Sequence, residues 1–233
     1  MNHRFNKKKK EEIMRKKLIK KTEFLNIRMV LDRSGSMNRR IKDTIDSINA
    51  FIQDQKDNNI FGVLTLSTFD TISIDVPIYR QEVNKLPKLD YDFLKPRAGT
   101  PLLDAIGIAI HDLENNPVKD DEKKVLVIVT DGYENSSREY KSETIRDLIK
   151  TKTEEGWLII YLGADHDAII QSRRYGFEYE KSLHYAKEDS RDAFRSVSRT
   201  IDDYSKGINP KSIKFMQQER AMSNKLKKFM EEE

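Results

Sequence analysis

The sequence contains no cysteine among its 233 residues. Without thiols the chain cannot form disulfides, use a thiolate nucleophile or hold zinc through cysteine ligands. This absence is consistent with a reducing compartment, and we expect the protein to be cytoplasmic.

Long hydrophobic runs are absent as well. The longest lie near Val125–Val129 and Trp157–Leu162, and both are far shorter than the roughly 20 residues of a transmembrane helix. Residues 1–21 are rich in lysine and lack the apolar segment of a secretory signal. We therefore expect no membrane span and no export signal. A lysine- and isoleucine-rich chain of this kind is consistent with a bacterial or phage origin.

Charge is distributed unevenly along the chain, which has a net charge of +4. Residues 1–22 contain ten Lys or Arg and two Glu, whereas the remainder contains 33 basic and 37 acidic residues. We predict a basic arm at 1–22, a domain at 23–207 and, after the turn at Gly207–Pro210, a charged tail or helix at 208–233. The arm is either a solvated tail or a segment that binds nucleic acid or another acidic surface.

Five segments have the pattern of β-strands. Four are apolar runs bounded by turn or cap residues, at Phe24–Leu31, Phe61–Phe69, Lys124–Thr130 and Trp157–Leu162. The last two are almost continuously apolar, as expected for strands that are covered on both faces of a sheet. The fifth segment, Thr71–Ile78, alternates apolar and polar residues and follows the second after a short link. This pattern predicts an antiparallel edge strand with one wet face.

Apolar residues recur at helical spacing between and after these strands. The helical patterns cover residues 41–52, 102–113, 145–149, 168–174 and 192–204. Strands that alternate with helices over about 180 residues indicate a doubly wound α/β sheet with helices on both faces.

Oxygen-bearing side chains gather where two of these strands end. One strand leads into Asp32, Ser34 and Ser36, and another leads into Asp131. Between them in the sequence, Thr100 lies on a glycine turn just before a predicted helix. Ligands of open α/β sheets bind at the carboxyl ends of the strands, so we expect these five side chains to form one site.

Two carboxylates and three hydroxyls form a set of hard oxygen ligands without histidine or cysteine. Such a set suits Mg²⁺ or Mn²⁺ and lacks the nitrogen or sulfur ligands that favour zinc and copper. Because Mg²⁺ retains several waters, one coordination position is expected to be open to a partner.

The order and spacing of Asp32-x-Ser34-x-Ser36, the Gly-Thr-Pro residue Thr100 and the Thr-Asp-Gly residue Asp131 resemble the metal-ion-dependent adhesion site of the von Willebrand factor type A domain. The resemblance covers roughly residues 24–204. It implies a Rossmann-like, mostly parallel six-stranded sheet with one antiparallel edge strand. It also implies that the three hydroxyls bind the metal, that the two carboxylates act directly or through water, and that a carboxylate of a bound protein fills the open position. Such a domain is a recognition module rather than an enzyme.

Four further residues near the predicted site have two interpretations each. Asp104 either supports the metal ligands or complements the dipole of its helix. Glu134 and Asn135 either shape the partner surface or are solvated turn residues. Asp165 is either part of a helix cap or a specificity element on the rim of the site.

The preferred hypothesis is a protein-binding module that recognises an acidic side chain of a partner through Mg²⁺. The Asp32 segment alone is also compatible with a strand end followed by an ordinary helix cap. A Mg²⁺-dependent hydrolase or phosphatase of the haloacid dehalogenase type also begins with an aspartate at a strand end, but it needs a second acid where this chain has Ser34. The sequence contains no phosphate-binding loop of the P-loop type. A nucleic-acid-associated adaptor that uses residues 1–22 is the remaining alternative.

Overall fold

The computed structural model describes residues 23–164, 166–185, 190–216 and 218–219. Its strands are β1 Leu25–Asp32, β2 Gly62–Phe69, β3 Ile74–Glu82, β4 Lys123–Thr130, β5 Leu158–Gly163 and β6 Ser182–His184. They form one sheet in the order β3-β2-β1-β4-β5-β6. Neighbouring strands are parallel except for β2 and β3, which are antiparallel. This arrangement confirms the predicted doubly wound, mostly parallel six-stranded sheet with one antiparallel edge strand.

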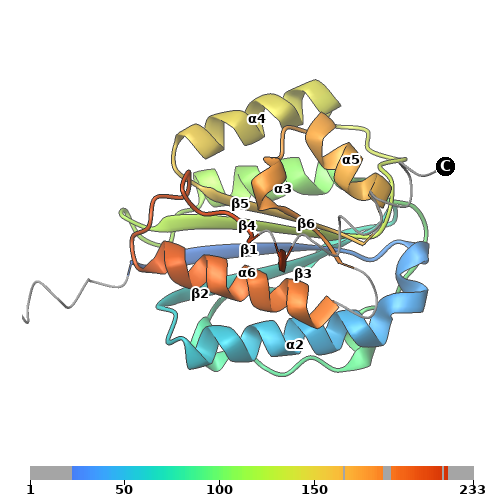
Figure 1. The fold of residues 1–233 in the computed structure, drawn as a ribbon. Coiled ribbons are helices and arrows are strands. Elements are labelled where there is room, and N and C mark those ends of the chain that lie inside the picture. Colours follow the sequence, from blue (N-terminus) through green and yellow to red (C-terminus); the bar gives the residue numbers. More distant parts are fainter. Residues whose placement is uncertain (1–22, 165, 186–189, 217, 220–233) are drawn as a thin grey trace, which may run out of the picture.

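Helices cover both faces of the sheet, as the sequence pattern predicts. They are α2 Ile41–Asp57, α3 Leu102–Asn115, α4 Ser142–Glu154, α5 His166–Arg174 and α6 Ser190–Ser205, with short 3₁₀ helices η1 Gly35–Arg40, η2 Val83–Lys85, η3 Tyr91–Phe93 and η4 Tyr179–Lys181. Helices α2 and α6 lie side by side on one face, and α3, α4 and α5 lie on the other (Figure 1).

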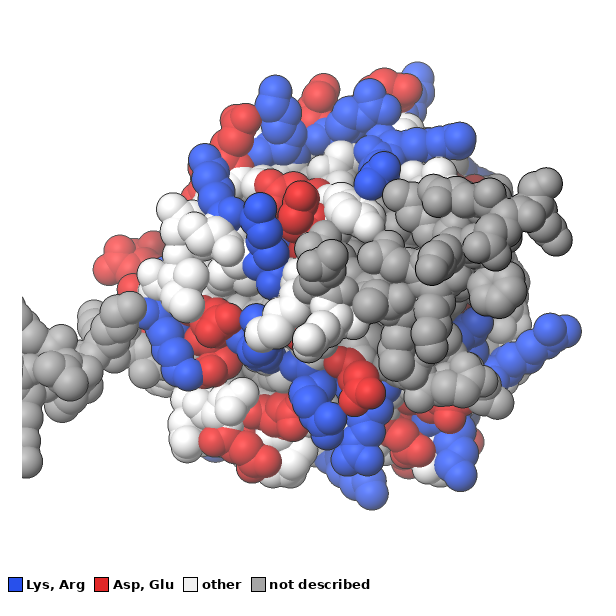
Figure 2. Space-filling model, in the orientation of Figure 1, with Lys and Arg blue, Asp and Glu red and all other residues white. Residues whose placement is uncertain are grey.

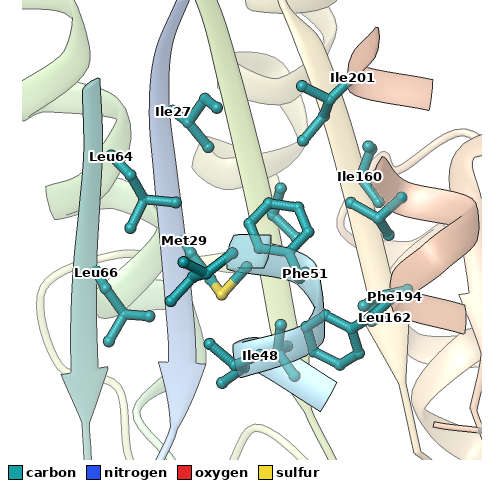
Figure 3. Packing of buried hydrophobic residues seen from close by; sticks show 14 of the residues in the cluster. Ile27, Met29, Ile48, Phe51, Leu64, Leu66, Ile160, Leu162, Phe194 and Ile201 are labelled. Carbon is teal, nitrogen blue, oxygen red and sulfur yellow. The ribbon is translucent and has the colours of Figure 1, made fainter. Parts of the chain in front are cut away.

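The central strands direct apolar side chains to both faces of the sheet, which explains their continuous hydrophobic runs. In β1, Ile27 and Met29 pack in the core that α2 and α6 cover, whereas Val30 packs in the core that α3 covers. On the first face, the rings of Phe51 and Phe194 meet edge to face with their centroids 6.3 Å apart (Figure 3). Both rings are fully buried, so they fix α2 and α6 against each other and against the sheet.

The edge strand predicted at Thr71–Ile78 begins and ends later in the structure, at Ile74–Glu82. The prediction of a regular apolar face is wrong at two positions. Ile72 and Val76 are 65% and 39% exposed. The Asp70 Oδ1 atom accepts the backbone N–H groups of residues 72 and 73, which holds them in a turn before β3 begins. The register between β2 and β3 then shifts twice along the pair, so alternation in the sequence does not become alternation in burial. The other four predicted strands agree with the structure to within one residue at each end.

The described part of the predicted C-terminal tail packs against the domain. Ile213 and Phe215 are buried in the core on the α6 side of the sheet. The backbone N–H of Phe215 also donates to the carbonyl of Glu180 at 3.0 Å. The arm at 1–22 and residues 220–233 lie outside the described residues. Across the part of the chain that the structure describes, no helix is both long and apolar enough to span a membrane.

Basic and acidic side chains are interspersed over the described part of the face seen in Figure 2. Charges on a mixed surface are screened over about 8 to 10 Å at physiological salt. Over this face, charges are therefore expected to act locally rather than as one extended field.

Candidate metal centre

Asp32 is the last residue of β1 and is fully buried. Its Oδ1 atom accepts the backbone N–H of Ser34 at 2.7 Å, and its Oδ2 atom accepts the hydroxyl of Thr130 at 2.5 Å. Thr130 ends the neighbouring parallel strand β4, so the sheet itself places the two residues side by side. The Asp32 carboxylate is thereby held in one orientation.

Two serines connect Asp32 to Asp131. The hydroxyls of Ser34 and Ser36 are 3.0 Å apart, and Ser36 donates to Asp131 Oδ1 at 2.6 Å. Ser34 is buried, whereas Ser36 is exposed. The row of oxygens therefore begins inside the domain at Asp32 and reaches the surface at Ser36, where a ligand from solvent can approach it.

Thr100 lies in the loop before α3, and its hydroxyl lies close to the oxygens of Asp32 and Ser34. The space beside Gly132 shows how close these three oxygens are to one another. A Cβ atom added at Gly132 would lie 3.1 Å from Thr100 Oγ1, 3.5 Å from Asp32 Oδ2 and 3.6 Å from Ser34 Oγ. Oxygens from two separate loops and the end of β1 thus surround one point that a glycine leaves open. The structure brings all five sequence-predicted residues together at this edge of the sheet.

Burial raises the pKa of the Asp32 carboxyl to about 6, and the nearby Asp131 carboxylate acts in the same direction. The hydrogen bonds from Thr130 and Ser34 lower this pKa but do not offset the loss of hydration. An ionised carboxylate in such a position is costly unless a positive charge compensates it. The electrostatics of the site therefore favour a bound cation.

Glu134 and Asn135 hold the Thr100 segment in place. Asn135 Oδ1 accepts the backbone N–H of Thr100 at 2.9 Å, and the Asn135 N–H donates to the Thr100 carbonyl at 3.2 Å. Glu134 Oε2 accepts the N–H of Leu103 at 2.9 Å, at the positive end of α3. Both residues thus join the loop after β4 to the threonine-bearing loop. Neither of the two interpretations from the sequence, a partner surface or solvated turn residues, includes this role.

Asp104 binds the same loop after β4. Its carboxylate accepts the backbone N–H groups of Arg138, Glu139 and Tyr140 at 2.8, 2.9 and 2.8 Å. Because Asp104 also lies in the first turn of α3, it connects that helix to the loop. Asp165 lies outside the described residues, and α5 begins immediately after it.

Two neighbours of the site were not singled out from the sequence. Thr130 binds the Asp32 carboxylate, and Arg40 Nε lies 3.8 Å from Asp131 Oδ2. The position of Thr130 directly before Asp131, at the end of a predicted strand, is the sequence feature that could have identified it. Arg40 lies about one helical turn after Ser36, and spacing alone does not show where so long a side chain ends.

The donors of this site fit a small, hard cation. Within the described ranges, no group of three or more acidic, histidine or cysteine side chains is placed to hold a metal. A metal here would depend on hydroxyls and water as well as on Asp32 and Asp131, which is the donor chemistry that Mg²⁺ and Mn²⁺ accept. Ligation by the five residues stays a prediction.

These features define a Rossmann-like α/β domain with an oxygen-lined site at the carboxyl edge of its central strands. Residues 27–134 match the family model of the von Willebrand factor type A domain, and all five predicted site residues fall within the match. The chain therefore contains a von Willebrand factor type A domain, as the motifs in the sequence indicated.

Solved structures share this fold. The pilus adhesin SpaC of Lactobacillus rhamnosus GG, in an open conformation, has a TM-score of 0.64 at 12% identity and covers 79% of this chain and 30% of its own. Proximal thread matrix protein 1 of the mussel byssus, with zinc in its metal-ion-dependent adhesion site, has a TM-score of 0.53 at 12% identity over 76% of this chain and 47% of its own. An aerotolerance-related membrane protein of Bacteroides fragilis has a TM-score of 0.50 at 13% identity over 75% and 97%.

At these identities the likeness shows the fold alone. This chain spans less than half the length of the adhesin and of the byssus protein. A comparison with curated protein sequences gives no significant match. The chemistry of the site therefore provides the evidence on function.

Proposed function

We propose that this domain is a divalent-metal-dependent protein-binding module. In this proposal Asp32, Ser34, Ser36, Thr100 and Asp131 hold Mg²⁺ or Mn²⁺, and the metal captures an acidic side chain of a partner protein. The observation that supports it most is the convergence of hydroxyl and carboxylate oxygens around Gly132. We place the protein in the cytoplasm of a bacterial or phage-infected cell, in keeping with its cysteine-free sequence.

The charge balance of the site explains why an acidic partner is expected. Two carboxylates only neutralise a divalent cation, so the ion still attracts a further carboxylate. Ser36 lies on the exposed side of the oxygen row, which gives that carboxylate access from solvent. A cation held by these residues would supply a positive charge in a partly desolvated pocket and would thereby favour one acidic side chain of a partner.

Replacing Thr100 by alanine tests the metal site directly. We expect the wild-type protein to bind Mg²⁺ in isothermal titration and Thr100→Ala to weaken the binding about tenfold, because water replaces one positioned ligand. Thr151→Ala is the matched control, since Thr151 is exposed on α4, and it should leave the affinity unchanged. Equal heats for the wild type and Thr100→Ala would contradict the proposal.

The partner can be sought by capture from a lysate in Mg²⁺ and in EDTA. A partner of this site should be retained by the wild type in Mg²⁺ and lost both in EDTA and with Thr100→Ala. The competing enzymatic hypothesis predicts a different result, namely Mg²⁺-dependent phosphatase turnover that disappears in Asp32→Asn.

Mg²⁺ is expected to stabilise the domain more at about pH 7.5 than at about pH 5. The pKa of Asp32 is about 6 in the folded domain, above its ordinary value of 3.8. The stability that Asp32 contributes to the metal-free domain is thus fully present below about pH 4 and is lost as the pH rises through about 6, a change of up to about 3 kcal/mol. A bound cation removes this loss.

Thermal unfolding with and without Mg²⁺ at the two pH values measures this difference. Asp32→Asn serves as the control because its amide does not titrate, and it should show neither the pH dependence nor the stabilisation. An equal Mg²⁺ effect at both pH values in the wild type would contradict the assigned role of Asp32.

A further inference from the structure

A partly buried ion-pair cluster lies beside the metal centre. At its middle is Asp70, the residue after β2, whose side chain is fully buried. Asp70 Oδ2 accepts the Nε–H of Arg33 at 2.7 Å and the Nε–H of Arg97 at 2.8 Å. Both arginines also donate to the hydroxyl of Ser73, each at 2.9 Å. We call these four residues the Asp70 cluster, in which one carboxylate binds arginines from two different loops.

The two loops that the Asp70 cluster joins are those that carry the predicted metal ligands. Arg33 lies within the segment Asp32–Ser36, and Arg97 lies three residues before Thr100. The backbones of these loops are paired as well, because the N–H of residue 97 donates to the carbonyl of residue 33 at 2.9 Å and the N–H of residue 35 donates to the carbonyl of residue 98 at 3.1 Å. The cluster therefore fastens the serine-bearing loop to the threonine-bearing loop.

The other oxygen of Asp70 fixes a third loop. Asp70 Oδ1 accepts the backbone N–H groups of residues 72 and 73 at 2.6 and 3.1 Å. Between Asp70 and these residues, the hydroxyl of Thr71 accepts the N–H of Gly99 at 3.1 Å. Gly99 directly precedes Thr100, so a shift of this turn would be passed to the backbone of a predicted ligand.

Asp70 is ionised in this setting. Burial acts to raise its pKa, but the hydrogen bonds from Arg97 and the backbone N–H groups, together with the charge of Arg33, outweigh burial and hold the pKa below its ordinary value. Charge-assisted bonds between arginine and carboxylate are strong and directional. A buried ion pair is nevertheless weak evidence for stabilisation of a fold, whereas its fixed geometry suits the placement of one loop against another.

We propose that Asp70 is a positioning residue for the metal centre. By binding both arginines at one oxygen, it sets the separation between the hydroxyl of Thr100 and the hydroxyls of Ser34 and Ser36. The inference rests on the proposed metal-binding function and adds to it a residue that does not itself coordinate the ion.

Asp70→Asn tests this role with little change of shape. The amide oxygen can still accept the backbone N–H groups of the turn, whereas the amide NH₂ faces the two arginine donors and cannot bind them. We expect the dissociation constant for Mg²⁺ to rise about tenfold in isothermal titration. Because this loss acts through Thr100, adding Thr100→Ala to Asp70→Asn should weaken binding by less than about a further twofold.

Two further variants separate positioning from general stability. Asp112→Asn breaks the ion pair of Asp112 with Arg28, whose atoms are 2.7 Å apart, at a position about 15 Å along α3 from its first residue. It should lower thermal stability and leave Mg²⁺ affinity unchanged. Arg97→Ala removes a side chain that is 44% exposed and should reproduce the approximately tenfold loss of Asp70→Asn. Arg97→Ala therefore still tests the positioning role if Asp70→Asn does not fold.

The possible outcomes distinguish this inference from the function on which it rests. If the wild-type protein binds no Mg²⁺, the proposed function and the positioning role both fail. If the wild type binds Mg²⁺ but the effects of Asp70→Asn and Thr100→Ala multiply to about 100-fold, the two residues act independently and only the positioning role is overturned. Unchanged affinity in Arg97→Ala would overturn it in the same way.

Discussion

Replacing Gly132 by alanine is expected to reduce Mg²⁺ affinity on the order of 100-fold, the upper end of what residues around a metal site cost. The added methyl group would lie 3.1 Å from Thr100 Oγ1 and 3.5 Å from Asp32 Oδ2. It would therefore occupy part of the space that these oxygens enclose and push the threonine-bearing loop outward. Isothermal titration with Mg²⁺ measures the loss, and circular dichroism checks that the variant is folded.

Gly35→Ala provides the matched control in the same part of the molecule. A Cβ atom at Gly35 would meet only the carbonyl oxygen of Ala98, at 3.5 Å, which is an ordinary contact. Although Gly35 lies between two predicted ligands, its substitution should change Mg²⁺ affinity by no more than about threefold. Full retention of affinity in a folded Gly132→Ala variant would mean that the ion binds elsewhere.

Phe194→Ala is expected to lower the free energy of unfolding by about 3 to 5 kcal/mol, the range for deletion of a fully buried aromatic side chain. The Phe194 ring lies 6.3 Å from the ring of Phe51 in α2 and 6.3 Å from the ring of Tyr185 after β6, measured between centroids. Its loss would leave a cavity where α6 meets α2 and the sheet (Figure 3). Urea unfolding monitored by circular dichroism gives the change.

Phe61→Ala is the comparison for this experiment. Phe61 is 51% exposed, and it pairs edge to face with Phe24 at 5.1 Å at the opposite end of the sheet from the metal centre. We expect a loss of about 1 kcal/mol, the value of an aromatic pair without a cavity. A Phe194→Ala variant that is no less stable than Phe61→Ala would contradict the described packing of α6.

The sequence predicts the fold well where burial is uniform along a strand. β1, β4 and β5 are covered on both faces, so any shift of register still buries their apolar residues, and composition alone identifies them. β3 begins later than its pattern predicts because a single carboxylate, that of Asp70, accepts the backbone N–H groups of residues 72 and 73 and holds them in a turn. β6 was not located, because its three residues, Ser182–His184, are too few to show a periodicity.

The predicted site could be identified because its five residues lie close to strand ends or a helix start, where the topology fixes position. The residues that support them could not be found in this way. Asp70 and Arg40 act through long or buried side chains whose partners are more than 25 residues away in the sequence, such as Arg97 and Asp131. Spacing in a sequence records which face of an element a residue occupies, but it does not record which distant loop its side chain will bind.

The irregular edge strand β3 limits how another chain can add to the sheet. A regular outer strand offers a row of free N–H and C=O groups to which another chain can add. In β3 this row is interrupted, because Pro77 has no N–H, Arg80 has a left-handed backbone with φ of 50°, and the Arg80 N–H donates to the Thr65 hydroxyl. Another chain therefore cannot extend the sheet by regular pairing along the whole length of β3.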